Sequence, residues 1–140
     1  MKFVCDAPKS RTWFRLETEA EAIIESTLMR HAVEKYFRRE MEAARASYQP
    51  GSTVFIEQEI GLKAHLRRRM ARFLTLRDAE GDALATAMLP PEEGGRDSRC
   101  IIVGPENADP YPAHGDAIAA LGQHLGANLD AARCYPYRRG

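Results

Sequence analysis

The sequence predicts an α+β fold, with a mainly antiparallel sheet of about five strands covered on one face by one long and two shorter helices. Two observations support it. Short runs of β-favouring residues are separated by turn residues, as in hairpins. The stretch 18–48 lacks Gly and Pro and repeats apolar residues at spacings of three, four and seven, as in a helix. The length of 140 residues fits a single domain, 1–140.

The chain opens with a predicted hairpin, whose strands we expect near 2–6 and 12–17. Both runs are rich in β-branched and aromatic residues, and Pro8-Lys9-Ser10 supplies the turn between them. Trp13 is expected to be a large anchor in the core or in an interface.

The stretch 18–48 is predicted to form one uninterrupted helix. Thr18 and Glu21 have capping-box spacing, and Pro50 marks the stop. Acidic residues crowd its start and basic residues follow later, which suits the helix dipole. The main apolar row consists of Ala22, Met29, Val33, Phe37, Met41, Ala44 and Tyr48. A second row beside it consists of Ile24, Leu28, Ala32 and Tyr36.

A helix of this length would span ~45 Å. The radius of gyration expected for a domain of this size is only ~14 Å, so one end of the helix would overhang the sheet. Overhanging apolar positions need cover, and a second copy of the chain is the simplest cover, which predicts a homodimer. The alternative is a kinked helix, or two shorter helices, packed wholly on the domain's own sheet.

A second helix is predicted at 59–69, where Glu59 and Lys63 have the spacing of a supportive ion pair. The preceding run 52–56 fits either a further strand or an extended lead-in to this helix.

The second half of the chain begins with a predicted hairpin, with strands at 73–78 and 83–89. Asp78 and Gly81 have the positions that a short hairpin loop requires. A buried strand follows at 99–103, and a third helix is expected to end at Gly126.

We expect the core to form where the sheet meets the long helix. Leu74, Leu76 and Ile102 are predicted to contact the apolar row at Val33 and Phe37. The polar segment 90–98 is expected to be an exposed loop, and the proline-rich segment 105–112 an ordered but irregular loop. The tail 134–139 is expected either to cover a sheet edge or to hang free.

Composition restricts the class of protein. A hydrophobic content of 44% and a charged content of 29% are ordinary for a soluble globular domain. The formal net charge of +0 argues against nucleic acid and anionic membranes as partners. The sequence has no signal-peptide pattern and no run near the ~18 apolar residues of a membrane span. Its Arg-rich composition is typical of a GC-rich genome, so a bacterial cytoplasmic protein is expected.

Cysteine and histidine spacing predicts neither a metal site nor a cofactor. The sequence contains no C-x-x-C or H-x-x-x-H pattern, and its three cysteines are far apart. Cys134, in the tail, is expected to be the most exposed of them. His31 and Glu34 form a single H-x-x-E pair with no second motif to complete a metal site. We expect His31 to be a hydrogen-bonded histidine at the edge of the core.

The best candidate for a ligand site is the loop 104–116. It follows a predicted strand and precedes a predicted helix, which is where binding residues often lie. Its candidate residues are Glu106, Asn107, Asp109, His114 and Asp116. An acid–base pair of Asp109 with His114 is chemically possible. The alternative is that Asn107 and Asp109 cap turns and Asp116 caps the third helix.

A weaker alternative is an anion site formed by His65, Arg69 and Arg72. These three residues can line up on one side of a helix, but no aromatic residue alternates with them for stacking. The alternative is a solvated basic face beside the apolar residues of the second helix.

Two classes of function remain open, and whether the protein is an enzyme is undecided. The first class is a non-enzymatic interaction or regulatory domain that self-associates through the helix 18–48. The second is a small enzyme or a small-molecule-binding protein with its site in 104–116. The sequence contains no phosphate-binding, dinucleotide-binding, zinc-protease or serine-hydrolase motif.

Overall fold

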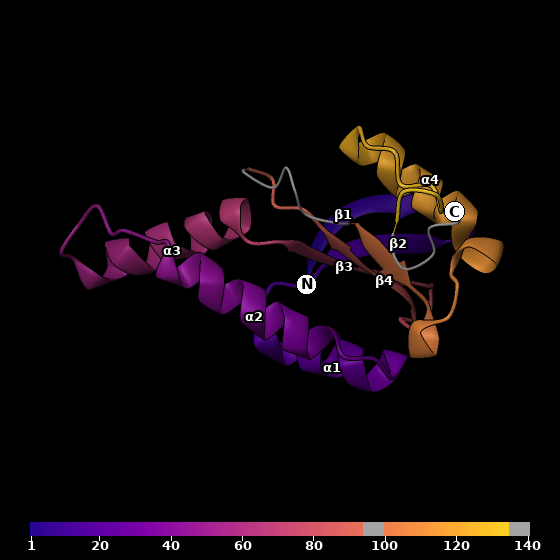
Figure 1. The fold of residues 1–140 in the computed structure, drawn as a ribbon, viewed down its shortest axis with the longest axis horizontal. Helices are drawn as coiled ribbons and strands as arrows, with labels where there is room; N and C mark the ends of the chain where they lie inside the picture. Colours follow the sequence, from indigo (N-terminus) through magenta and orange to yellow (C-terminus); the bar gives the residue numbers. More distant parts are fainter. Residues whose placement is uncertain (94–99, 135–140) are drawn as a thin grey trace.

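An antiparallel sheet forms the centre of the computed structural model, which describes residues 1–93 and 100–134 (Figure 1). Within these residues the sheet has five strands that pair in chain order. The strands are β1 (Lys2–Ala7), β2 (Arg11–Arg15), β3 (Arg72–Arg77), β4 (Ala83–Leu89) and β5 (Ile101–Val103). All five predicted strands are present, and the α+β fold class is confirmed. A bulge interrupts β1 between Phe3 and Cys5, and β5 is only three residues long.

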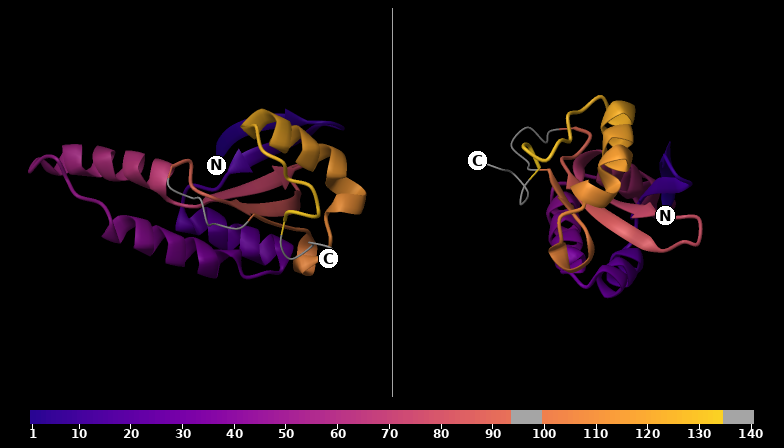
Figure 2. Two further views of the ribbon diagram at one scale, coloured as in Figure 1. Left: turned by 45° about the horizontal axis from the view of Figure 1, so that its top comes forward. Right: turned by 90° about the vertical axis from the view of Figure 1, so that its right-hand side faces the viewer.

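The helices lie on both faces of this sheet (Figures 1 and 2). They are α1 (Glu19–Met29), α2 (Val33–Ala46), α3 (Phe55–Arg69) and α4 (Tyr111–Leu125), and a 3₁₀ turn, η1 (Pro105–Asn107), precedes α4. α1 and the start of α2 cover one face, and α4 covers the other. The expectation that all helices share one face was therefore wrong.

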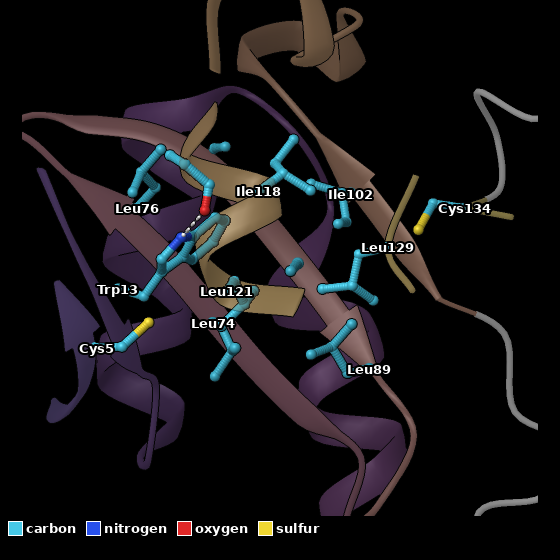
Figure 3. Close-up of a cluster of buried hydrophobic side chains, with 13 residues drawn as sticks. Cys5, Trp13, Leu74, Leu76, Leu89, Ile102, Ile118, Leu121, Leu129 and Cys134 are labelled. Atoms are coloured by element: carbon cyan, nitrogen blue, oxygen red, sulfur yellow. Dashed lines mark hydrogen bonds between the residues drawn. The ribbon is translucent and has the colours of Figure 1, made fainter. Parts of the chain in front are cut away.

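The core is divided into two clusters, one on each face of the sheet. Neighbouring residues of a strand point to opposite faces, so Phe73 and Leu74 belong to different clusters. The α4-face cluster contains Trp13, Leu74, Leu76, Ile102, Ile118 and Leu121 (Figure 3). The α2-face cluster contains Leu16, Ala22, Val33, Phe37, Met70 and Phe73. Leu74, Leu76 and Ile102 therefore do not contact Val33 and Phe37, contrary to the prediction.

The stretch 18–48 is broken, and the prediction of one uninterrupted helix was wrong. The capping box of Thr18 and Glu21 is present, but α1 ends at Arg30, whose φ is 54°. α2 then turns back along α1 (Figure 1). The first backbone N–H groups of α2 need hydrogen-bond partners from outside the helix. The Ser26 hydroxyl supplies one, because it accepts from the Glu34 N–H at 2.9 Å. The second apolar row is left largely exposed at Ile24, Leu28 and Tyr36.

α2 and α3 form an antiparallel helix pair, the arm, that extends beyond the sheet (Figures 1 and 2). α3 begins at Phe55, so the run 52–56 is not a strand. Gly61 permits close packing of the arm, because a Cβ there would collide with the Tyr48 hydroxyl. The Tyr48 hydroxyl donates to the carbonyl of Gln58 at 3.2 Å.

α4 begins earlier than expected and has a kink at His114, where φ is −129°. It ends at Gly126 in the left-handed conformation, as predicted. Cys134 is completely buried in the α4-face cluster, so the expectation of an exposed thiol was wrong. Part of the predicted loop 90–98 and most of the tail 134–139 lie outside the described residues.

Candidate functional site

The five candidate residues of the loop 104–116 make contacts with different parts of the structure. Glu106 and Asn107 lie on η1 in the left-handed region, and Glu106 accepts from Arg30 Nη1 at 2.7 Å. His114 and Asp116 lie on α4 and contact Arg11 of β2. Asp109 accepts from the N–H of Tyr111 at 3.0 Å, which fits the alternative that this residue caps a turn.

Arg11 holds His114 and Asp116 together. Its guanidinium is buried and donates to His114 Nδ1 at 2.9 Å, to Asp116 Oδ1 at 2.7 Å and to the carbonyl of Pro8. Burial, and then the charge of Arg11, lower the pKa of His114. The hydrogen bond from Arg11 lowers the pKa of Asp116. A neutral imidazole that accepts from Arg11 is suited to joining β2 to α4.

A cavity of about 250 Å³ lies beside His31, between the start of α2, the sheet and η1. Its floor is apolar and comes from β3, β4 and β5, with Phe73 and Met88 among its residues. The side chains with polar groups in its lining are His31, Tyr36, Thr86 and Asn107. Of the five loop candidates, Asn107 is the one that lines this cavity.

A hydrogen-bond chain runs from His31 into the interior. Val33 N–H points at His31 Nδ1 at 3.4 Å, so Nε2 carries the proton and donates to Thr86 Oγ1 at 2.9 Å. The Thr86 hydroxyl donates to Glu25 Oε2 at 2.5 Å, and Arg77 Nη2 donates to Glu25 Oε1 at 2.8 Å. Burial lowers the pKa of His31, which keeps the ring neutral.

The sequence interpretation missed Glu25 and Thr86. Glu25 is completely buried, and it contacts Thr86 across 61 positions of the chain, a separation that no spacing motif encodes. One signal was available. Glu25 lies three residues after Ala22 and four before Met29, so helical spacing puts this carboxylate on the apolar face of α1.

The weaker anion candidates are only partly brought together. His65 and Arg69 line a hollow of about 400 Å³ on the arm, but they share it with the carboxylates of Glu40 and Glu93. His65 Nε2 also donates to the carbonyl of Ala44 at 2.9 Å. Arg72 lies on β3, where its Nε donates to the carbonyl of Pro90.

The arm carries an apolar surface that the sequence interpretation did not predict. No residue of α3 is buried. Phe55, Ile56 and Ile60 are 72%, 68% and 65% exposed, the highest values for large apolar side chains in the described part of the chain. Val54, just before α3, is 52% exposed. These residues were missed because the run 52–56 also fitted a strand.

A second hollow, of about 320 Å³, lies at the base of the arm, where α2 and α3 meet the end of β2. Phe37, Met41 and Leu66 contribute its apolar lining, and Lys63 and Arg67 add positive charge. Glu17 also lines this hollow, and its carboxylate lies 3.7 Å from Arg67 Nη2.

No family model, curated protein or solved structure matches this chain. Within residues 1–93 and 100–134, no three side chains of the metal-binding types gather into a cluster. None of the helices described is both long and apolar enough to cross a membrane. The choice among the candidate sites therefore depends on the geometry of these residues.

Proposed function

We propose that the protein is a non-enzymatic interaction or regulatory domain that self-associates through its arm. One observation supports this proposal above the others: α3 has no buried residue and carries the three most exposed large apolar side chains among the described residues. Contiguous apolar surface of this kind is uncommon on soluble monomers and typical of interaction sites. Because the stretch 18–48 is broken, it does not form the long overhanging helix that was expected to pair with a second copy. The arm is the part of the molecule that we propose for this contact instead.

The candidate catalytic groups favour the same class of function. The Arg11 guanidinium is committed to His114, Asp116 and a backbone carbonyl. The Thr86 hydroxyl accepts from His31 and donates to Glu25. Groups satisfied in this way hold elements of the fold together and have little capacity left to activate a substrate.

Light scattering across a dilution series tests the proposal. We expect the wild-type chain of 15.7 kDa to have twice that mass at high concentration and to dissociate on dilution. Ile60→Asp should give monomers at every concentration, because it puts a charge into the proposed apolar contact. Ile24→Asp is the matched control, since Ile24 is 55% exposed on α1, and it should keep the wild-type mass.

The outcomes separate the parts of the proposal. A wild-type chain that is monomeric throughout would overturn self-association. A dimer that is disrupted by Ile24→Asp and unaffected by Ile60→Asp would retain self-association and assign it to α1 in place of the arm.

A second candidate function is small-molecule binding in the His31 cavity. The observation that favours it is the carboxamide of Asn107, which has no hydrogen-bond partner among the described residues and lines an apolar cavity of about 250 Å³. Such a combination fits an apolar ligand with one polar group. Fluorescence of an anilinonaphthalene sulfonate probe, measured on the Ile60→Asp chain, should fall when Ala32→Trp narrows the cavity. An unchanged signal would reject this site.

A further inference from the structure

We infer that two copies of the chain pair their arms antiparallel, so that the apolar tip of each arm enters the hollow at the base of the other. The tip is Val54, Phe55 and Ile56, and the hollow is the one lined by Phe37, Met41 and Leu66. This inference rests on the proposed function and adds to it the partner surface, the orientation and the position of the two-fold axis.

One side of α3 is available for pairing with a second copy. Gly61 and His65 face α2, because a Cβ on Gly61 would meet Tyr48 and His65 donates to the carbonyl of Ala44. Helical spacing therefore places the opposite side of α3 away from Tyr48 and Ala44. The residues of that side, all exposed, are Ile56, Glu59, Ile60, Lys63 and Arg67.

Acidic and basic residues are separated along this face. The first half of α3 carries Glu57 and Glu59, and the second half carries Lys63, Arg67 and Arg68. An antiparallel pair sets the acidic half of one helix against the basic half of the other, whereas a parallel pair opposes like charges. The helix dipoles favour the same orientation.

Two of these charges have no ion-pair partner within residues 1–93 and 100–134. Glu59 and Lys63 have the spacing of an intrahelical ion pair, but among the described residues neither makes a salt bridge or a side-chain hydrogen bond. Both side chains are exposed. In the antiparallel pair, Glu59 of each copy faces Lys63 of the other, at nearly equal distances on either side of the axis.

The spacing between the tip and the hollow along α3 fits an antiparallel pair. Phe55 and Leu66 are eleven positions apart on α3, which is ~16 Å along the helix axis. A two-fold axis midway between them, beside Ile60, places each tip at the other copy's hollow. The hollow, at about 320 Å³, is large enough for two apolar side chains. Because the contact is reciprocal, the same pairing covers both tips and both hollows and closes as a dimer.

Cysteine cross-linking tests the position of the axis. A residue beside a two-fold axis meets its own copy, so Ile60→Cys should form an intermolecular disulfide when treated with diamide. Cys100→Ser in the same chain removes the half-buried native thiol. Ile24→Cys is the matched control on α1. We expect most of the Ile60→Cys chain, and little of the control, to run as a covalent dimer without reductant. Equal cross-linking of the two variants would overturn the placement of the axis.

Charge exchange tests the orientation. Glu59→Lys and Lys63→Glu should each weaken the dimer roughly tenfold, because each variant turns two attractive contacts into repulsive ones. The double variant Glu59→Lys/Lys63→Glu should recover the wild-type dissociation constant, and a mixture of the two single variants should form heterodimers. A parallel pair predicts no loss in either single variant, since Glu59 would already face Glu59.

The results distinguish this inference from the function on which it rests. A wild-type dimer that neither single charge variant weakens would overturn the antiparallel arrangement and leave self-association intact. A wild-type monomer at every concentration would overturn both.

Discussion

At the scale of single residues, the most consequential arrangement is the buried group of His31, Thr86, Glu25 and Arg77. Removing a carboxylate from water costs several kcal/mol, and two donors at hydrogen-bond distance offset that cost for Glu25. The group ties α1 and the start of α2 to β3 and β4. His31 is, as expected, a hydrogen-bonded histidine at the edge of the core.

This arrangement predicts a pH dependence of stability. Burial lowers the pKa of His31 from its ordinary value of 6.5, so the unfolded chain binds its proton first as the pH falls. The stabilisation from a neutral His31 is complete above that value and is lost as the pH falls through the folded pKa. His31→Gln keeps a donor for Thr86 without titrating. Its unfolding free energy, from urea denaturation, should fall less than the wild-type value between about pH 7.5 and about pH 5.5.

A matched control is His124→Gln, because His124 is exposed on α4. That variant removes an imidazole that lies outside the buried group, so the slope of His31→Gln is compared with its slope. Part of the slope should survive in His31→Gln, since burial also lowers the pKa of His114. Identical slopes for His31→Gln and the wild-type chain would contradict the assignment.

At the scale of elements, the corner between α1 and α2 determines where the arm points. Arg30 ends α1 with φ 54°, a conformation that glycine adopts without penalty and other residues adopt at a cost of roughly 1 kcal/mol. Arg30→Gly should therefore have an unfolding free energy about 1 kcal/mol higher than Arg30→Ala. Both variants lose the exposed ion pair with Glu106, so comparing them isolates the backbone contribution. Equal denaturation midpoints would show that the left-handed residue carries no penalty here.

Local patterns predicted the elements better than their arrangement. The five strands, the Thr18 capping box and the stop at Gly126 each depend on residues within a few positions, and each was predicted. The break at Arg30 depends on partners elsewhere, because Ser26 satisfies the start of α2 and His31 reaches Thr86 of β4. No Gly or Pro marks that corner.

The candidate site was less predictable for the same reason. Asp116 and His114 did come together, but through Arg11, which lies more than a hundred positions away in the chain. Which face of the sheet each helix covers is also a tertiary property. Alternation along β3 supplies apolar side chains to both faces, through Phe73 on one and Leu74 on the other, and the sequence does not state which helix meets which.

At the scale of the whole molecule, the two core clusters share one sheet and should unfold together. Phe37 packs on Phe73 with ring centroids 5.2 Å apart, and Phe37→Ala should lower the unfolding free energy by ~3–5 kcal/mol. Trp13, the single tryptophan, lies in the other cluster. Its fluorescence should nevertheless report the same shifted midpoint as circular dichroism. Two separate transitions would show that the faces unfold independently.

The two borders of the sheet offer little to strand pairing between copies of this protein. One outer strand is bent by its bulge at Phe3 and Cys5, and the opposite one spans three residues. Neither offers a long, straight row of free backbone groups for an incoming strand. Growth into fibres by strand addition is therefore disfavoured, which fits the proposed pairing through helical side chains, since that pairing would close at two chains.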